Sequence, residues 1–513
     1  MKSSSLMQKM LLQLAAHMME MVASSTKKNQ NSKRLYTYCT AFAYFIESRY
    51  EKLKILKQGD NGAAKIIRKK TLNEQAEYRL SLYIYLFAEN DRYLIRHLLT
   101  CEITELTETE MQAVQQIQKA PVPYSFIKEN GLEQLAEKRY IVETSYNELK
   151  QYQQTVFLLK TMAGSKKGLG SYTILPTTGC NARCVYCYEE GYAVRTMTIE
   201  TADRLIDFIC ETKHDDAVKL RWFGGEPTAA SHIIRHICKG LQERNVPFKS
   251  SMVTNASLIT KELAHEMQEL WHLQKVQVSL DGAKEDYTIR KNYFNPEKHN
   301  YDVVMQAVQF LLDEGIHVQL RVNVDFDNLE RMPAFIQEMQ ERFSGAEHLT
   351  MYIVPLYQAE QSDRCIEVYK EIFRLTDMQR EIGIPQSEKA KDKTHTAHLK
   401  LNFCMADNLK KSIVITPDGI FNNCEHLPEK NTWGNIFDGI TSQEKYKELC
   451  TTPEIDKACA ECPFLPECTP FHKKGCPGYF KKCREYRCLR TEYVLHRLLQ
   501  AVNIESDDVD EEI

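Results

Sequence analysis

The middle of this chain alternates between strand-like and helix-like segments, and this pattern limits the possible folds more than any other feature of the sequence. Helical periods such as ETADRLIDFICETK and YDVVMQAVQFLLDEG separate six apolar stretches that have the character of buried strands. These stretches are YTILPTT, AVKLRWFGG, FKSSMVTNA, KVQVSLDG, HVQLRVNVD and LTMYIVPLY. Because parallel strands need right-handed helical crossovers, six repeats predict a parallel sheet that curls into an open partial barrel. Active groups are then expected at the carboxyl ends of its strands.

The segments on either side of this barrel have a different character. From about residue 80, apolar stretches broken at AENDR indicate a hairpin, and LTETEMQAVQQIQ offers a threonine cap before a helical period. The predicted fold class is therefore α/β, a partial (β/α)6 TIM-like barrel with an N-terminal α+β module and a C-terminal cysteine-rich domain. The predicted segments are 1–79 (N-terminal helical segment), 80–165 (small α+β module), 170–357 (barrel), 358–400 (bridging segment), 401–495 (cysteine-rich domain) and 496–513 (acidic tail).

Composition and charge place the chain among soluble globular proteins. Of its 513 residues, 43% are hydrophobic and 27% charged, and the net charge of -4 favours neither nucleic acid nor an anionic membrane as a partner. The run LMQKMLLQLAAHMMEMVASS is interrupted by Lys9, Gln13, His17 and Glu20, which favours an amphipathic helix over a signal peptide. Without an apolar run of about 18 residues, no membrane span is expected. We predict a cytoplasmic protein.

The seventeen cysteines are unevenly distributed. Eleven of them fall into two groups, three at residues 180–187 and eight from Cys404 to Cys488, with Cys450 counted among the six scattered ones. Because a reducing cytoplasm disfavours structural disulfides, such clustering indicates metal binding or redox chemistry.

The first group, Cys180, Cys184 and Cys187, directly follows the first predicted strand of the barrel. Structural zinc sites use four ligands in pairs, and thioredoxin-like motifs use two thiols, so this spacing fits neither well. Three thiolates can hold a [4Fe–4S] cluster and leave one iron open to a substrate or cofactor. The alternative is a structural metal knuckle.

The pattern Cys-x-x-x-Cys-x-Tyr-Cys after the first strand of six βα repeats resembles the radical S-adenosylmethionine (SAM) enzymes. GGEP ends the second strand, TNA the third and VSLDG the fourth, and LRVNV lies in the fifth. In such enzymes SAM binds the open iron, and an electron from the cluster breaks its S–C5′ bond to give a 5′-deoxyadenosyl radical. The resemblance implies SAM contacts from Tyr186, Gly224, Gly225, Glu226, Asn255, Ser279, Arg290 and Val322.

These residues have different expected roles in the resemblance. Glu226 accepts from the SAM amino group, while Ser279 and Arg290 hold the carboxylate and the ribose region. The backbone around Val322 and the ring of Tyr186 lie near the adenine. Taken singly, Glu226 and Ser279 are ordinary loop residues, and only their order at successive strand ends distinguishes them.

The second cysteine group resembles the SPASM extension, which binds two auxiliary iron–sulfur clusters in radical SAM enzymes that modify peptides. Seven residues separate Cys468 from Cys476 where the family has three, which we interpret as a loop insertion. Carried over, the first auxiliary cluster takes Cys404, Cys424 and Cys476, and the second takes Cys459, Cys462, Cys468 and Cys488, with Cys483 as the alternative to Cys488. The chain would then carry three [4Fe–4S] clusters. A pair of zinc knuckles is the competing interpretation.

Glu425 directly follows Cys424, at the position where sulfatase-maturing relatives place a catalytic acid. The resemblance makes it a candidate general base. An exposed loop glutamate without a catalytic role is the alternative.

The resemblance implies a peptide maturase of the sactipeptide or ranthipeptide type, which forms thioether bonds in a cysteine-rich precursor peptide. Carbon–carbon crosslinking and formylglycine formation remain alternatives, and an iron–sulfur redox sensor or scaffold is the non-enzymatic one. Expected partners are a precursor peptide with a leader and a reductant such as flavodoxin or ferredoxin, with no nucleic acid and no membrane. The module at 80–165 would bind the leader as an added strand, along SLYIYLF or YLIRHLL, or would serve only as a structural cap on the barrel.

Overall fold

The computed structural model describes residues 72–100, 102–163, 168–214, 217–385, 411–425, 432–450, 455–468 and 482–510. The chain divides into two compact units, and neither is continuous in sequence. Of the described residues, 72–163 and 455–468 belong to the first unit, and the others form the second.

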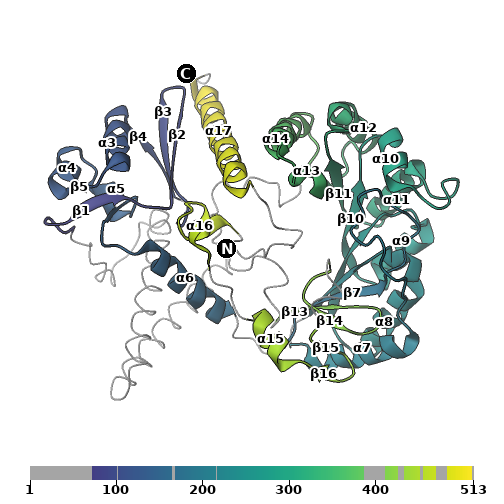
Figure 1. Ribbon diagram of the computed structural model, residues 1–513. Helices are drawn as coiled ribbons and strands as arrows, with labels where there is room; N and C mark the ends of the chain where they lie inside the picture. Colours follow the sequence, from purple (N-terminus) through teal and green to yellow (C-terminus); the bar gives the residue numbers. More distant parts are fainter. Residues whose placement is uncertain are drawn as a thin grey trace, which may run out of the picture. The chain divides into compact units, whose positions relative to one another are not determined.

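The first unit combines two small antiparallel sheets with short helices (Figure 1). One sheet has the strand order β5-β1-β6 and the other β2-β3-β4. The strands are β1 Glu77–Leu80, β2 Ile84–Glu89, β3 Arg92–His97, β4 Ile103–Leu106, β5 Val122–Pro123 and β6 Ile141–Glu143. The helices are α3 Glu108–Lys119, α4 Tyr124–Glu129, α5 Glu133–Glu137, α6 Glu148–Ala163 and α16 Lys457–Ala460, with a 3₁₀ turn at Leu465–Glu467.

Local sequence signals explain the predicted parts of this unit. Asn90 and Asp91 form the tip of the β2–β3 hairpin with φ of 47° and 59°, the left-handed pair that a two-residue turn requires. Thr107 caps α3 through a reciprocal capping box with Glu110. The hairpin at AENDR and the threonine cap are therefore confirmed.

One predicted boundary is wrong in this unit. The helical segment was expected to run to residue 79, but Glu77–Leu80 form β1 between β5 and β6. Tyr78 is buried in the core of the unit, and Arg79 lies opposite Val142 across the ladder. A four-residue strand whose two partners lie more than forty residues away leaves no local periodicity to read. Residues 1–71 lie outside the described part.

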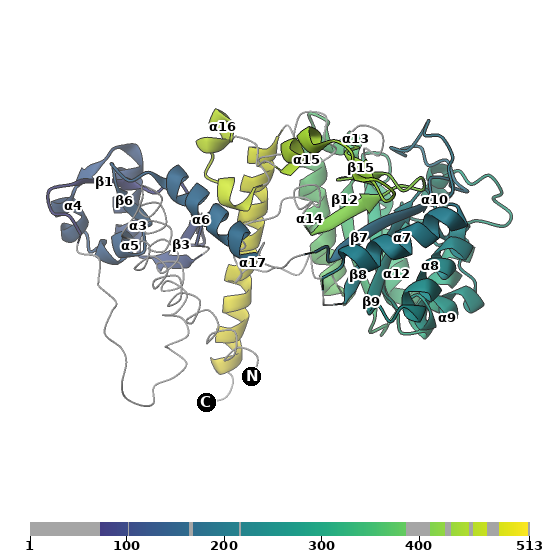
Figure 2. The ribbon, with the colours of Figure 1, turned by 90° about the horizontal axis from the view of Figure 1, so that it is seen from below.

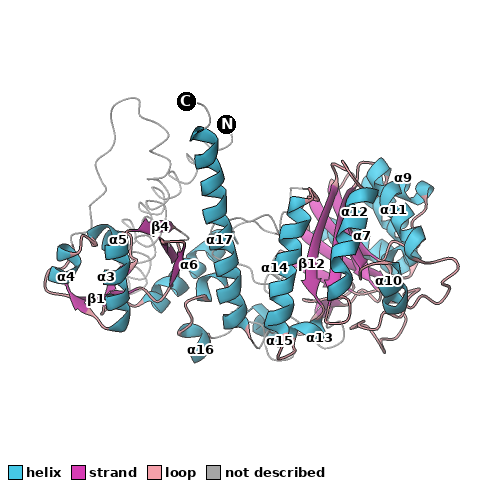
Figure 3. Cartoon of the chain, turned by 90° about the horizontal axis from the view of Figure 1, so that it is seen from above, coloured by secondary structure: helices cyan, strands magenta, loops and turns pink. Residues whose placement is uncertain are grey.

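The second unit contains the predicted barrel. Its parallel strands β7 to β12 stand in sequence order, with helices between them, so the partial (β/α)6 architecture is confirmed (Figure 3). The strands are β7 Ser171–Thr177, β8 Val218–Gly224, β9 Phe248–Thr254, β10 Leu273–Leu280, β11 His317–Val324 and β12 Leu349–Pro355. The helices are α7 Ile199–Thr212, α8 Ser231–Glu243, α9 Lys261–Glu269, α10 Lys284–Lys291, α11 Tyr301–Asp313, α12 Met332–Arg342, α13 Tyr357–Glu360 and α14 Cys365–Glu381, with 3₁₀ turns at Pro227–Ala230 and Leu329–Arg331.

The core of this unit lies between the strands and their helices. Along each strand, alternate residues such as Trp222, Val278 and Leu320 are fully buried against helical residues such as Ile237 and Val308. Helix α14, which the sequence interpretation assigned to a bridging segment, belongs to the same core and serves as the helix after β12.

The cysteine-rich segment contributes to the barrel sheet itself. Strand β13 (Ser412–Ile415) pairs in parallel with β7, and β14 (Phe421–Asn422) pairs antiparallel with β13, which gives an eight-stranded sheet (Figures 1 and 2). Pairing with β13 covers the otherwise exposed edge of β7. The other elements are β15 Gly434–Asn435, β16 Gly439–Ile440, α15 Gln443–Cys450 and α17 Cys483–Asp510.

Helix α17 crosses the predicted boundary at residue 495. It packs on α14, where the rings of Phe373 and Tyr493 stack at 4.4 Å and Arg497 forms an ion pair with Asp377. None of the described helices is both long and apolar enough to cross a membrane.

Candidate active site

The cysteine loop directly follows β7, at the carboxyl end of the sheet. Cys180, Cys184 and Cys187 are all partly buried there. The backbone N–H of Cys187 donates to the Cys184 carbonyl at 3.0 Å, and that of Val185 donates to the carbonyl of Arg290 at the end of α10, also at 3.0 Å. The loop is therefore held against the C-terminus of α10.

The three thiols are candidate ligands for one positively charged metal group that all three would bind. Burial raises the pKa of all three, that of Cys180 to about 12, with the charge of Glu226 adding to the shift at Cys180. Bound iron would favour the thiolate forms. Among the residues that the structure describes, no three Cys, His, Asp or Glu side chains gather closely enough to ligate a single metal ion. Three thiol donors in one loop fit a [4Fe–4S] cluster, in which each cysteine ligand binds a different iron.

The glycines of GGEP allow the end of β8 to touch the cysteine loop. A Cβ on Gly224, where φ is 117°, would lie 2.2 Å from the carbonyl oxygen of Thr177. A Cβ on Gly225 would lie 2.4 Å from that of Gly179. No larger residue fits at either position, because both obstacles are backbone atoms. The two glycines thus position the loop that carries Cys180.

Glu226 is fully buried and accepts hydrogen bonds from both neighbouring strand ends. Its Oε1 accepts from the backbone N–H of Thr228 at 3.1 Å and from the hydroxyl groups of Thr228 and Thr254 at 2.5 and 2.7 Å. Its Oε2 accepts from the backbone N–H of Asn255 at 2.7 Å. Burial raises the pKa of Glu226, and these hydrogen bonds oppose that shift. The carboxylate therefore joins the ends of β8 and β9, and its expected role toward SAM stays a prediction.

Asn255 connects this junction to the cysteine loop. Its Nδ2 donates to Asn181 Oδ1 at 2.9 Å and lies 3.9 Å from the Cys180 sulfur. The structure thus brings together Asn255, Glu226 and Cys180, which the sequence placed on three different strand ends.

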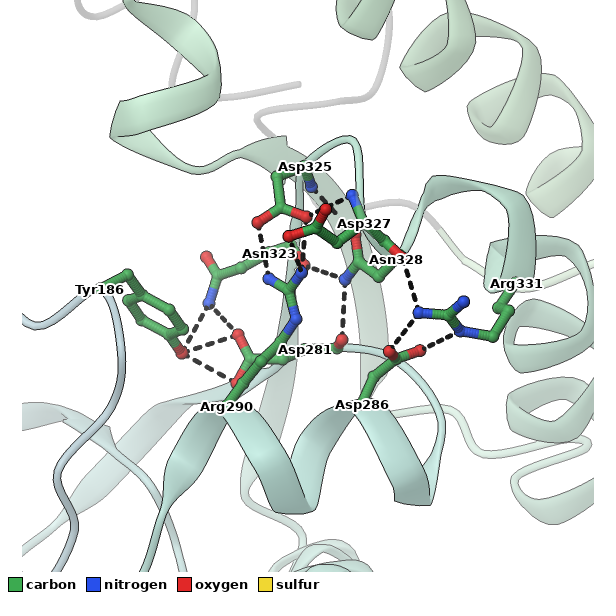
Figure 4. A network of polar contacts seen from close by, with 9 residues as sticks. All are labelled: Tyr186, Asp281, Asp286, Arg290, Asn323, Asp325, Asp327, Asn328 and Arg331. Atoms are coloured by element: carbon green, nitrogen blue, oxygen red, sulfur yellow. Dashed lines mark hydrogen bonds and ion pairs between the residues drawn. The ribbon is translucent and has the colours of Figure 1, made fainter.

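A buried polar network surrounds Tyr186, the tyrosine between Cys184 and Cys187 (Figure 4). Its hydroxyl donates to Asp281 Oδ1 at 2.6 Å and accepts from Lys291 Nζ at 2.9 Å. Burial raises the pKa of Tyr186, so the phenol stays protonated. Asn323 at the end of β11 donates to the same Asp281 oxygen at 3.1 Å (Figure 4).

Asp281 and Lys291 form a fully buried ion pair at 3.2 Å within this network. Burial alone would lower the pKa of Lys291, but the nearby carboxylate of Asp281 reverses the shift and raises it well above the ordinary value. The charge of Lys291 also lowers the pKa of Cys184, although burial is the larger influence there and raises it. Sequence reasoning missed Lys291, and it quoted Asp281 and Asn323 only as parts of VSLDG and LRVNV.

The remaining predicted SAM residues lie on β10, α10 and β11. Arg290 forms a bidentate ion pair with Asp325, at 2.9 and 2.5 Å (Figure 4). Ser279 is partly buried near the end of β10. Val322 on β11 pairs with Leu280 on β10, and its side chain is buried in the core. Only the backbone of Val322 is therefore suited to contact a cofactor, as the resemblance implies.

Glu425 is buried, so the alternative of an exposed loop glutamate is wrong. It is 7% exposed on the loop after β14, and its Oε1 lies 3.3 Å from Arg221 Nη1 on β8. Neighbouring Cys424 is buried as well, whereas Cys404 and Cys476 lie outside the described residues. Cys424 and Glu425 therefore lie just after the strands that extend the barrel sheet.

The remaining predicted ligands lie in both units. Cys459, Cys462 and Cys468 are partly buried in the first unit, on α16 and the turns that follow it. Cys483 and Cys488 lie in the first turns of α17 in the second unit, and the choice between them stays a prediction.

Comparison with known proteins agrees with this geometry. Residues 174–339 match the model of the Radical SAM superfamily. The antilisterial bacteriocin subtilosin biosynthesis protein AlbA of Bacillus subtilis (strain 168) is 25% identical over 331 residues, which cover 60% of this chain and 65% of AlbA. Fe-coproporphyrin III synthase of Methanosarcina barkeri (strain Fusaro / DSM 804) is 27% identical over 168 residues, 32% of this chain and 39% of that protein.

A solved structure supports the fold. Native anSMEcpe with bound AdoMet matches with a TM-score of 0.50 and 16% identity, over 66% of this chain and 99% of that chain. The chain spans less than two thirds of the length of either curated relative named above. It contains a radical SAM domain, which holds the cysteine loop, GGEP and the network around Tyr186.

Proposed function

We propose that this chain, a radical SAM enzyme by its domain at residues 174–339, is a peptide maturase that forms thioether bonds between cysteine sulfur and carbon in a ribosomally made, cysteine-rich precursor peptide. The observation that carries the proposal is the cysteine loop at the carboxyl end of β7, braced by Gly224 and Gly225. Similarity to AlbA, a subtilosin biosynthesis protein, favours a peptide substrate.

The residues of the loop have the roles of ligands and supports. Cys180, Cys184 and Cys187 would hold a [4Fe–4S] cluster, and Glu226 and Asn255 keep the strand ends beside Cys180 in register. When bound, this cluster and SAM would supply a 5′-deoxyadenosyl radical that removes a hydrogen atom from the acceptor carbon of the peptide.

Glu425 is the residue that we assign as proton acceptor. Formation of a thioether breaks one C–H bond, whose hydrogen atom the adenosyl radical takes, and one S–H bond, whose proton needs a base. The C–S bond then forms with release of one electron, which an auxiliary cluster would accept. The Glu425 carboxylate is buried beside Arg221 on the barrel sheet, with its Oε1 3.3 Å from the arginine Nη1. We therefore propose that Glu425 accepts the proton of the substrate cysteine.

Two auxiliary clusters complete the proposal. Their proposed ligands are Cys404, Cys424 and Cys476 for the first, and Cys459, Cys462, Cys468 and Cys488, or Cys483 in its place, for the second. Cys424 is buried and directly precedes Glu425. A first auxiliary cluster bound by Cys424 would therefore lie close to the proposed proton acceptor. A flavodoxin or ferredoxin in the cytoplasm is the proposed reductant.

We further propose that the first unit binds the leader of the precursor by strand addition. In its sheet β2-β3-β4 the edge strands are β2 and β4. The stretch SLYIYLF, which contains the first four residues of β2, therefore remains a candidate edge. YLIRHLL contains all of β3 except Arg92, and β3 is paired on both sides and leaves no edge for a peptide.

The first experiment tests the enzyme class. Anaerobically reconstituted protein with SAM and dithionite is expected to release 5′-deoxyadenosine, and Cys184→Ala is expected to abolish it. An iron–sulfur sensor or scaffold would release none, and such a result with the cluster intact would refute the proposal.

The second experiment separates the reaction types. A candidate precursor peptide is expected to lose two hydrogens per crosslink and one alkylatable thiol with each. Carbon–carbon crosslinking also removes two hydrogens but leaves every thiol open to alkylation. A new aldehyde, detected with a hydrazide probe, would instead indicate formylglycine.

A further inference from the structure

The segment 455–468 is built into the core of the first unit. Phe464 and Leu465 are each 1% exposed, and the Phe464 ring lies 5.8 Å from the ring of Tyr85 on β2. Arg96 on β3 forms an ion pair with Glu467, and both side chains are largely buried. The β2–β3 hairpin therefore holds the segment that carries Cys459, Cys462 and Cys468.

Two buried hydroxyl groups of the first unit have no hydrogen-bond partner among the described residues. They belong to Tyr83, just before β2, and Tyr152 on α6, which are 0% and 1% exposed. Their ring centroids are 6.3 Å apart. A buried hydroxyl without a partner costs about 1–3 kcal/mol, and native proteins seldom leave one unsatisfied. Two such groups side by side point to a shared acceptor.

Two kinds of acceptor lie near these hydroxyl groups. The Glu148 carboxylate is close to Tyr83 but accepts from Arg79, Ser81 and Leu82 instead, and the others are cysteine sulfurs. Burial raises the pKa of the Tyr83 hydroxyl, and among the smaller causes is the negative charge of an ionised Cys462. Burial also raises the pKa of Tyr152, with Cys468 as the second cause. Each hydroxyl thus lies within electrostatic range of a different cysteine of the segment. Sulfur ligands of an iron–sulfur cluster carry negative charge and accept hydrogen bonds.

We propose that Tyr83 and Tyr152 donate hydrogen bonds to the sulfur atoms of the cluster that Cys459, Cys462 and Cys468 hold. The first unit then sets the reduction potential of this auxiliary cluster. The inference rests on the second auxiliary cluster of the proposed function and adds two positioning residues to it. Because β2 begins one residue after Tyr83, a peptide that joins the edge of β2 would order the same strand that positions this donor.

Redox titration of the reconstituted full-length protein tests the proposal. Cys462→Ala identifies the redox wave of this cluster, because that wave alone should disappear. Tyr83→Phe and Tyr152→Phe are each expected to move the same wave to a more negative midpoint potential, and the double variant further. Donors to sulfur favour the reduced, more negatively charged cluster, so their removal disfavours it. Iron and sulfide content should stay unchanged.

Tyr140→Phe is the matched control. Tyr140 is fully buried in the same unit, but its hydroxyl already has a partner in Thr104 at 3.0 Å. This variant should leave all midpoint potentials where they are.

The other possible results separate failure of this inference from failure of the proposed function. Unchanged potentials in both tyrosine variants would overturn this inference and leave the proposed function intact. If Cys462→Ala removes no wave while 5′-deoxyadenosine still forms, the second auxiliary cluster and this inference are both wrong. Should the tyrosine variants not load the cluster, electron–nuclear double resonance of the reduced wild type in D₂O gives the answer. The absence of exchangeable protons coupled to the signal lost in Cys462→Ala would then refute the hydrogen bonds.

Discussion

Glu226 is a buried residue whose hydrogen bonds hold the strand ends of the candidate site together. It accepts four hydrogen bonds, two of them from the backbone N–H groups of Thr228 and Asn255, and it has no exposed surface. Asn255 in turn contacts Asn181 and lies close to the sulfur of Cys180. The carboxylate therefore determines where the third strand end meets the cysteine loop.

We predict that Glu226→Gln destabilises the second unit by about 1–3 kcal/mol and lowers the iron content of the SAM cluster site. A glutamine must place its NH₂ group against one of the two backbone N–H groups, so one buried donor loses its acceptor. Thermal unfolding and iron analysis of a variant that lacks the auxiliary ligands measure both effects. Glu262→Gln, at an exposed position in the first turn of α9, is the control and should leave thermal unfolding close to that of the wild type. Full iron loading in Glu226→Gln would contradict the assigned role.

At single positions, motif reading identified the residues but not their partners. The sequence places Cys180, Glu226 and Tyr186 at strand ends, because order and spacing along the chain carry that information. It does not show that Tyr186 shares Asp281 with Lys291, 105 residues beyond the tyrosine. Such pairings depend on the register of strands and on side-chain direction, which no local pattern encodes.

Among the secondary elements, the turn between β13 and β14 connects the cysteine-rich segment to the barrel. Gly419 lies in this turn with φ of 76°, and a Cβ there would lie 2.8 Å from the side chain of Ile436. The turn leads directly to Cys424 and Glu425. Its conformation therefore affects both the extended sheet and the candidate base.

We expect Gly419→Ala to destabilise the second unit by about 2–4 kcal/mol, from the left-handed backbone and from the contact with Ile436. Gly345→Ala is a matched control, since Gly345 also has φ of 76° but nothing within 4 Å of the added Cβ. The control should cost only about 1–2 kcal/mol. Urea unfolding followed by tryptophan fluorescence measures both variants. Equal losses of unfolding free energy in the two variants would show that the contact with Ile436 does not contribute to the destabilisation.

The six barrel strands could be predicted because each is long, apolar and followed by its own helix. The strand pair β13–β14 could not be predicted in the same way, because its strands have four and two residues and pair with a strand some 240 residues earlier. β1 was missed for the same reason. Short strands are stabilised by their partners, and only the folded chain identifies these partners.

At the scale of the whole molecule, two separate cores share one chain. The core of the first unit is built around Tyr78, Ile95 and Tyr140, and that of the second lies between the barrel strands and their helices. All three tryptophans of the chain, Trp222, Trp271 and Trp433, belong to the second unit. The two units can therefore be followed by different probes in one experiment.

The first unit contains a buried neutral histidine that makes its stability depend on pH. His97 is 3% exposed, and its Nδ1 accepts from the backbone N–H groups of Leu99 and Thr100 at 3.2 and 3.4 Å. Burial lowers the pKa of His97 from 6.5 to about 4. Below pH 6.5 the unfolded chain binds a proton that the folded unit does not, so acid favours unfolding. The stability is fully present above pH 6.5 and is lost as the pH falls toward 4.

We predict that the first unit loses about 2 kcal/mol of stability between pH 7 and pH 5, since each pH unit in this window contributes up to 1.36 kcal/mol. Pulse proteolysis in urea, with cleavage sites in 72–163 mapped by mass, measures this loss, while tryptophan fluorescence follows the second unit in the same samples. His97→Gln removes the titrating group and should make the first unit nearly insensitive to pH over this range. An equally steep dependence in His97→Gln would show that other groups cause the acid sensitivity. If tryptophan fluorescence of the wild type shows the same loss of stability in the second unit, the two units unfold together.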